Sequence, residues 1–143
     1  RASRFLLRNE KKSPVERFPE VKTMVSDFKR LKVWHKSINF AAMVYKMTKY
    51  FPNSEKFGLT SQIRRAAVSI SGNIAEGCGK STKKDFARYL YNAYGSVKEV
   101  ENYLILASKL DIISNMKYDE TMPHCEEVSK MLFSLIKSLE KQG

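Results

Sequence analysis

QIRRAAVSISGNIAEG, residues 62–77, is the stretch that decides how this chain is expected to fold. Five polar residues recur along it at steps of three, four, four and three: Gln62, Arg65, Ser69, Asn73 and Glu76. At about 100° per residue, these side chains share a sector of roughly 80° on one face of an α-helix. The apolar residues Leu59, Ile63, Ala66, Ile70 and Ile74 lie on the adjoining sector. A surface helix usually keeps polar residues opposite its apolar face, so this stripe indicates polar groups that find partners at the edge of a core.

Partners for the stripe are expected on the helix that follows it. We expect Arg64 or Arg65 to pair with the carboxylate of Glu99 or Glu101, while the hydroxyl and amide groups of the stripe satisfy neighbouring polar groups. Such a network fixes helix register or a contact between subunits more than it adds stability. The predicted structural network consists of Gln62, Arg64, Arg65, Ser69, Asn73, Glu76, Glu99 and Glu101.

Hydrophobic periodicity and helix-end signals predict four helices. The first begins at Asp27 or Leu31 and ends at Phe51 before Pro52, and the second begins at Ser54 or Thr60 and ends at Glu76, with Gly77 as its C-terminal glycine. The third begins at Ser81 or Thr82, with Asp85 in capping-box position, and ends near Leu110; the fourth begins near Thr121 with Pro123 in its first turn. The core of the third is expected along Phe86, Leu90, Ala93, Val97, Val100, Leu104 and Ala107, and that of the fourth along Val128, Met131, Leu132, Leu135 and Leu139. Short links and no strand-like alternation predict an all-α, antiparallel up-down four-helix bundle.

The first helix carries two apolar stripes on nearly opposite sides. One consists of Leu31, Trp34, Ile38, Ala42 and Tyr45, and the other of Phe40, Val44, Met47 and Phe51. A helix of a small monomeric bundle needs one such face, so the second favours burial against another copy of the chain. The expected oligomer interface consists of Phe40, Val44, Met47 and Phe51, with Tyr91 and Tyr94 of the third helix. The alternative is a first helix that is central and wrapped by its own neighbours.

Composition limits the class of protein. The 143 residues suffice for one core, and no apolar run is long enough for a membrane span. Lysine and arginine number 26 against 15 acidic residues, a net charge of +11 that favours a polyanionic partner such as RNA. Cys78, Cys125, His35 and His124 have no metal-ligand spacing, so we expect no metal, no cofactor and no small-molecule substrate. Two isolated cysteines suit a reducing cytoplasm.

The first residues differ from the rest of the chain. Residues 1–26 have short apolar patches and mixed charge without sustained helical periodicity, and they match neither a secretory signal nor an organellar presequence. Met24 is close to the expected usual start. We therefore predict an N-terminal extension over residues 1–26 and a bundle domain over residues 27–143.

Residues 63–70 (IRRAAVSI) and 73–77 (NIAEG) resemble the signature of four-helix-bundle proteins encoded in 23S rRNA intervening sequences. The similarity continues through residues 31–34 (LKVW), Lys36, residues 51–52 (FP), residues 57–62 (FGLTSQ), residues 95–96 (GS), Glu99 and Glu101, and it spans about residues 27–140. The chain has Ser71-Gly72 where relatives carry proline followed by serine. The resemblance implies a four-helix bundle that assembles into a ring, with a pentamer expected, and it implies no settled biochemical activity.

The turn between the second and third helices carries the candidate binding residues. Residues 79–81 (GKS) match the tail of a phosphate-binding loop, but the first glycine is replaced by Ile74 and the turn follows a helix, so nucleotide hydrolysis is rejected. Lys80, Lys83 and Lys84 nevertheless gather at a helix N-terminus, where a bound anion would offset their charge and meet free backbone N–H groups. The alternative is a solvated cluster partly balanced by Asp85.

Catalysis is the weakest interpretation. A catalytic site with Glu76 as base and Arg65 as anion clamp would be incomplete. The sequence offers no nucleophile–histidine pair, metal-ligand set or cofactor loop to complete it. We therefore expect a non-enzymatic homo-oligomer that binds RNA or a ribonucleoprotein partner through Lys80, Lys83, Lys84 and Arg88. The alternative is a protein-interaction scaffold with secondary RNA affinity, similar in architecture to the accessory variability determinants of diversity-generating retroelements.

Overall fold

The computed structural model describes residues 27–142, which form four α-helices, two short 3-10 helices and no strand. The elements are η1 (Phe28–Arg30), α4 (Lys32–Thr48), η2 (Asn53–Glu55), α5 (Leu59–Cys78), α6 (Lys83–Lys109) and α7 (Asn115–Gln142). The predicted all-α class with four helices is confirmed. The predicted extension over residues 1–26, including Met24, lies outside the described residues.

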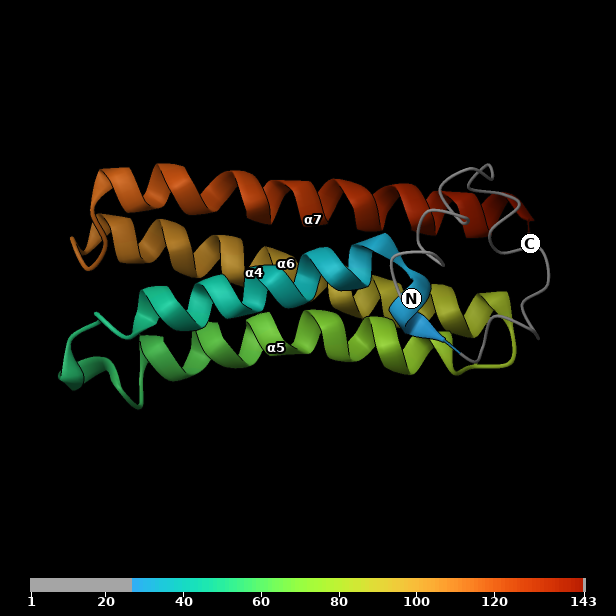
Figure 1. Ribbon diagram of the computed structural model, residues 1–143, viewed down its shortest axis with the longest axis horizontal. Coiled ribbons are helices and arrows are strands. Elements are labelled where there is room, and N and C mark those ends of the chain that lie inside the picture. Colours follow the sequence, from blue (N-terminus) through green and yellow to red (C-terminus); the bar gives the residue numbers. More distant parts are fainter. Residues whose placement is uncertain (1–26, 143) are drawn as a thin grey trace.

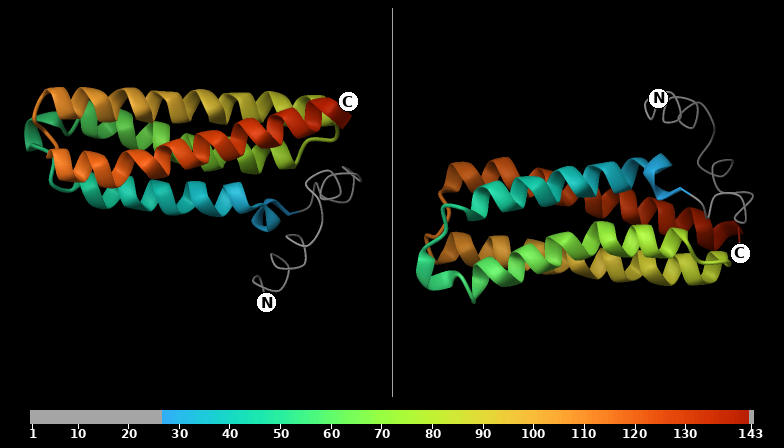
Figure 2. Two further views of the ribbon diagram at one scale, coloured as in Figure 1. Left: turned by 90° about the horizontal axis from the view of Figure 1, so that it is seen from above. Right: turned by 60° about the horizontal axis from the view of Figure 1, so that its bottom comes forward.

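The four helices lie lengthwise beside one another, and their links alternate between the two ends of the molecule (Figure 1). The α4–α5 and α6–α7 links share one end, and the α5–α6 link lies at the other. The most extensive contacts are those of α6 with α5 and with α7, and α4 contacts α5 more extensively than it contacts α7 (Figure 2). Along α5 and α6, Ser69 bonds to Ser96 whereas Gly77 approaches Phe86, so these two helices run in opposite directions.

All four helices contribute to one core. The stripes predicted for α5 and α6 face inward, and α7 buries three of its five predicted residues, Val128, Leu132 and Leu139, while Met131 and Leu135 are half-buried. The fully buried large side chains include Phe40, Val44, Ile63, Ile70, Ile74, Phe86, Leu90, Val97, Leu104, Leu132 and Ile136. Burial of large apolar side chains contributes about 1.5–3 kcal/mol each, so this core is the main stabilising term of the fold.

The predicted start and end of α6 are confirmed. Thr82 caps the helix by accepting a hydrogen bond at its Oγ1 atom from the Asp85 N–H, with a donor–acceptor distance of 3.1 Å. At the other end the Ile112 N–H donates to the Ala107 carbonyl at 2.8 Å, and Asp111 has a φ of 57°. This arrangement is a Schellman motif with an aspartate in the left-handed position that glycine usually fills.

The start predicted for α7 is wrong. The helix begins at Asn115 rather than near Thr121, because the Ser114 hydroxyl accepts a hydrogen bond from the Lys117 N–H at 3.0 Å and caps the helix there. Pro123 therefore lies inside the helix. Its ring is exposed, so the carbonyl that loses its donor can bind water instead.

The prediction that one stripe of α4 forms an oligomer interface is also wrong. Phe40, Val44, Met47 and Phe51 are between 0% and 8% exposed, because they pack into the core of a single chain. They are not available for a contact between copies. The outward side of α4 is the other stripe, where Ile38 is 38% exposed.

Gly77 serves helix packing rather than helix termination. Helix α5 continues to Cys78, and its capping residue is Gly79, with a right-handed φ of −83°. A Cβ atom on Gly77 would lie 2.7 Å from the Tyr89 Cβ and 3.3 Å from the Phe86 carbonyl oxygen. The missing side chain therefore permits the close approach of α5 and α6. Gly72, on the same helix, has no neighbouring atom within 4 Å of the corresponding position.

This contrast predicts opposite effects for two identical substitutions. Gly77→Ala should lower the free energy of unfolding by about 1–3 kcal/mol, because the new methyl group forces the two helices apart. Gly72→Ala should raise it by about 0.5–1 kcal/mol, because alanine favours the helix without a clash. Urea denaturation followed by circular dichroism measures both, and equal effects from the two variants would contradict this account of Gly77.

Candidate functional site

Four cations gather where α5 turns into α6. The link is short and Thr82 fixes the start of α6, so Lys80, Lys83, Lys84 and Arg88 lie within the link and the first two turns of the helix. Lys84 and Arg88 are exposed, and Lys80 and Lys83 are half-buried. This turn lies at the end of the molecule opposite to the other two helix links (Figure 1). The structure thus brings together the four residues that were predicted to bind nucleic acid.

An aromatic ring lies within this basic cluster. The Lys80 Nζ atom is 5.0 Å from the centroid of the Tyr89 ring, and the Arg88 Cζ atom is 4.8 Å from it. Both distances are typical of cation–π contacts, which hold the two charges beside the ring. Tyr89 is absent from the predicted site. Its position next to Arg88, on the same helix as Lys83, could have identified it from the sequence.

A cleft of about 570 Å³ lies between α6 and α7 beside the cluster. Lys83, Lys84, Asp85, Ala87, Arg88, Tyr91, Leu139 and Glu140 line it. Its two carboxylates only partly offset its cations, because Asp85 Oδ1 lies 3.8 Å from Arg88 Nε and Glu140 is held by Tyr91. The cleft combines positive charge with an apolar wall, an arrangement suited to a phosphate group attached to a flat or apolar moiety.

Tyr91 connects α6 to the last turn of α7. Its hydroxyl donates a hydrogen bond of 2.8 Å to Glu140, and this bond raises the pKa of Tyr91. The same bond, assisted by Lys137, lowers the pKa of Glu140. Glu140 is therefore an ionised acceptor at neutral pH and not a proton donor. Tyr91 remains 44% exposed, and its predicted place in an oligomer interface stays a prediction.

Tyr94, the other tyrosine expected at an interface, is half-buried within the chain. Its ring centroid lies 6.3 Å from that of Phe133 on α7, and the Lys98 Nζ atom lies 5.2 Å from the ring. These contacts assign Tyr94 to the packing of α6 on α7.

The polar stripe of α5 forms a network that extends to α6. The Asn73 Nδ2 group donates to the Ser69 carbonyl at 2.9 Å and to the Ser69 hydroxyl at 3.0 Å. The Ser96 hydroxyl donates to the Ser69 hydroxyl at 2.9 Å. Arg65 donates to the Gln62 side chain within the same helix. The stripe thus joins two helices through small hydroxyl groups.

The expected ion pairs between the arginines and the next helix are wrong. Arg64 turns toward α4, where its Nε atom donates to the Thr48 hydroxyl at 2.7 Å and its guanidinium lies 4.6 Å from the Tyr45 ring centroid. Thr48 is buried, so this bond ties α5 to α4 at the edge of the core.

Glu101 pairs instead with Lys98 of its own helix, at 3.2 Å. Within residues 27–142, no ion pair connects Arg64 or Arg65 to Glu99 or Glu101. Glu76 and Glu99 are exposed. Spacing alone placed the arginines on the correct helix but could not show that the two face different neighbours.

Neither cysteine forms a disulfide, and both are unsuited to nucleophilic chemistry. Burial raises the pKa of the Cys78 thiol to about 11 and that of Cys125 to about 12, so both are protonated at neutral pH. Within residues 27–142, no group of three histidine, cysteine, aspartate or glutamate residues could hold a metal ion. No helix of that region has the length and apolarity that a membrane span needs.

A family model described as 23S rRNA-intervening sequence protein matches residues 29–134. The chain belongs to this family. The four helices of the bundle all lie largely within the matched range, and the Lys80–Arg88 turn lies at its centre. No curated protein matches the chain.

A solved structure supports the family assignment. It is the crystal structure, at 1.70 Å resolution, of a protein of unknown function from the S23 ribosomal protein family of Bacteroides thetaiotaomicron VPI-5482. The two chains are 31% identical with a TM-score of 0.69, and the match covers 73% of this chain and 98% of the other. The similarity therefore covers nearly the whole of that relative.

The bond between Tyr91 and Glu140 has a measurable signature. In a Tyr91→Phe variant, the pKa of Glu140 should rise toward its usual value, because the carboxylate loses its main donor. The stabilisation from this bond is present above the usual pKa of a glutamate and is lost as pH falls through the lowered pKa. NMR titration of the side-chain carboxyl carbons measures this shift. A Tyr94→Phe control should leave the pKa of Glu140 unchanged, and an equal shift in both variants would refute the assignment.

Proposed function

We propose that this member of the family is a non-enzymatic, basic homo-oligomer that binds RNA, or a ribonucleoprotein, through charge. The observation that carries the proposal is the gathering of Lys80, Lys83, Lys84 and Arg88 at one end of the bundle. The net charge of +11 and the ribosomal RNA context in the family's name support the same class of partner.

The chemistry of the turn fits a phosphodiester backbone. The N-terminus of α6 offers backbone N–H groups and the positive end of the helix dipole, while Thr82 satisfies the N–H of Asp85. Lys80 and Arg88 both lie over the Tyr89 ring, which holds the two cations close together where they can contact a phosphate backbone. The proposed recognition is of phosphates rather than of a base sequence.

Self-association would multiply this site. The family resemblance favours a ring, with five copies expected, in which each copy contributes one basic cluster. Several weak phosphate contacts in one assembly gain avidity, since later contacts form at high effective concentration. Exposed apolar side chains, among them Ile38 and Tyr45 of α4 and Tyr91 of α6, leave surface for contacts between copies.

Binding without catalysis is supported by the state of the reactive groups. Both thiols are buried and protonated, and the His35 ring nitrogen Nε2 is 2.7 Å from the Lys29 carbonyl oxygen, at hydrogen-bond distance. Buried cysteines that form no disulfide suit a reducing cytoplasm, which we propose as the location. A protein-interaction scaffold is the competing function, and it predicts no dependence on the four cations.

The proposal predicts that the cluster dominates RNA affinity. Changing Lys80, Lys83 and Lys84 together to glutamine should weaken binding of a fluorescein-labelled stem-loop RNA at ~150 mM salt at least about tenfold. The slope of log affinity against log salt should become shallower by about 2, because each lost phosphate contact of a single-stranded segment removes about 0.7. Fluorescence anisotropy over a salt series measures both quantities.

A matched control removes the same number of positive charges from another part of the surface. Changing the exposed Lys49, Lys109 and Lys130 to glutamine removes three positive charges outside the turn, and it should leave most of the affinity intact. Light scattering of both variants verifies that the assembly is unchanged. If both variants lost RNA affinity to the same extent, net charge and not the α5–α6 turn would explain binding. If the wild-type protein bound no RNA, the protein-interaction scaffold would be favoured.

A further inference from the structure

The cleft between α6 and α7 holds two ammonium groups that no carboxylate balances. Lys83 and Lys84 line this cleft, and within residues 27–142 neither of them forms an ion pair. The two carboxylates of the cleft, Asp85 and Glu140, belong to other pairs: the first lies 3.8 Å from Arg88 Nε, and the second lies 3.4 Å from a lysine of its own helix. Positive charge that the protein leaves unbalanced favours an anionic ligand at this place.

Tyr91 adds an aromatic ring to the same cleft. Its hydroxyl bond of 2.8 Å to Glu140 holds the ring in one orientation, and 44% of the residue stays exposed. Among residues 27–142 no cation lies over this ring, whereas Arg64 lies over the similarly exposed ring of Tyr45, 4.6 Å from its centroid. A ring that is already held in place, with an open face, loses little freedom when a flat group stacks on it.

The ring and two of the cations follow one stripe of α6. Lys84, Arg88 and Tyr91 are four and three residues apart, so at about 100° per residue they share a sector of about 60°. A rise of 1.5 Å per residue places Arg88 about 4.5 Å and Lys84 about 10.5 Å from Tyr91 along the helix axis. Leu139 of α7 supplies apolar surface on the opposite wall. The cleft thus offers an aromatic ring and then cations, the order in which a nucleotide presents its base and its phosphate.

The size of the cleft selects one nucleotide. Its volume of about 570 Å³ is that of a pocket for a single small molecule. Within a duplex the flat faces of the bases stack on one another, whereas single-stranded loops and ends present bases that can stack on aromatic side chains. Because every base has such a face, this contact distinguishes an unpaired base from a paired one and does not read sequence.

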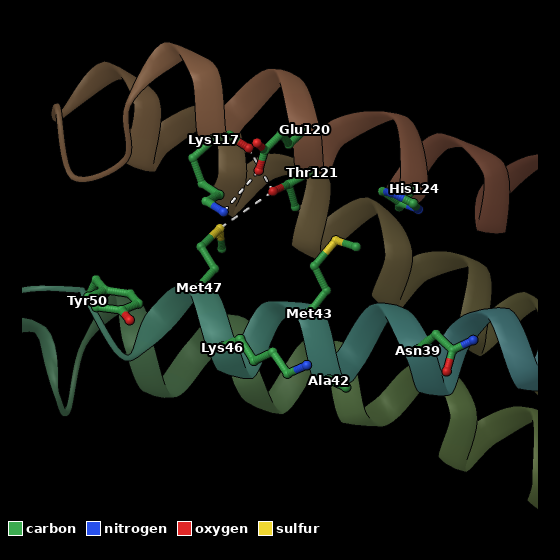
Figure 3. Close-up of a pocket in the computed structure, with 10 residues that line it drawn as sticks. All are labelled: Asn39, Ala42, Met43, Lys46, Met47, Tyr50, Lys117, Glu120, Thr121 and His124. Carbon is green, nitrogen blue, oxygen red and sulfur yellow. Dashed lines mark hydrogen bonds and ion pairs between the residues drawn. The ribbon is translucent and has the colours of Figure 1, made fainter.

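The groove between α4 and α7 is a poorer site for the same ligand (Figure 3). Its volume is about 640 Å³, but one of its two lysines, Lys117, already pairs with Glu120 at 3.0 Å. The Thr121 hydroxyl faces the buried Met47, with 3.8 Å between Oγ1 and Sδ. Tyr50, on the α4–α5 link, lines this groove and is 88% exposed. The groove therefore provides an exposed tyrosine that is remote from the basic turn and can serve as a control.

We propose that the α6–α7 cleft holds one unpaired nucleotide of the bound RNA, with its base against the Tyr91 ring and its phosphate among Lys83, Lys84 and Arg88. This inference rests on the proposed function and adds the kind of RNA that the site takes, which is a single strand or a stem with an unpaired loop or end. The cations attract the phosphates of any RNA, and the ring supplies the preference for an unpaired base.

Two substitutions at one position separate the ring from its hydrogen bond. Tyr91→Phe and Tyr91→Leu both remove the bond to Glu140, but only the second removes the ring. The affinity for a fluorescein-labelled single-stranded RNA should fall about tenfold in Tyr91→Leu and stay within about twofold in Tyr91→Phe, because stacking needs the ring alone. A fully paired RNA of the same length should bind the wild type and both variants equally. Fluorescence anisotropy at ~150 mM salt measures these affinities.

Tyr50→Leu is the matched control, since it removes an exposed tyrosine from the other groove and should change neither affinity. The salt slope should be unchanged in Tyr91→Leu, because no phosphate contact is lost. Equal losses for the single strand and the duplex, or no loss for the single strand, would overturn the inference, while the lysine variants judge the proposed function separately. A changed mass of Tyr91→Leu in light scattering would assign Tyr91 to a contact between copies and would also overturn it. A wild-type protein that binds no RNA would overturn both proposals.

Discussion

The close approach of α5 and α6 is the contact on which the rest of the bundle depends. It requires a residue without a side chain at Gly77, where a Cβ would lie 2.7 Å from the Tyr89 Cβ, and small hydroxyl groups farther along, where Ser69 meets Ser96. Larger residues at these positions would separate the helices. With that spacing fixed, α6 presents its apolar stripe to the core, and the basic turn between the two helices is held at one end of the molecule.

The sequence predicts the helices well because their signals are local. The capping residue Thr82 and the inward stripes of α5 and α6 follow from spacing alone, and the structure places them as expected. The start of α7 was mispredicted because proline is most frequent in a first turn, whereas Ser114 provides a cap without the acidic residue that usually identifies one. Periodicity also showed that both sides of α4 are apolar, but only the structure shows that Phe40 lies inside the chain's own core.

The candidate site was predictable to the extent that its residues are neighbours in the chain. The four cations lie within nine residues of sequence, so a helix start is enough to gather them. The cleft beside them was not predictable, because it depends on Glu140, which meets Tyr91 across 49 positions of sequence. The same limit explains Arg64: a stripe assigns a residue to a sector of its helix, and only the packing shows that this sector meets Thr48.

The alternation of the helix links between the two ends has a consequence for symmetry. It separates the basic α5–α6 turn from the exposed aromatic α4–α5 link by the full length of the bundle (Figure 1). Any closed ring whose axis is parallel to the helices must then be a polar object, with every cationic turn on one rim and every α4–α5 link on the other. A polyanion would meet such a ring from one side only. The bundle therefore carries a built-in direction, which a dihedral assembly of the same copies would cancel.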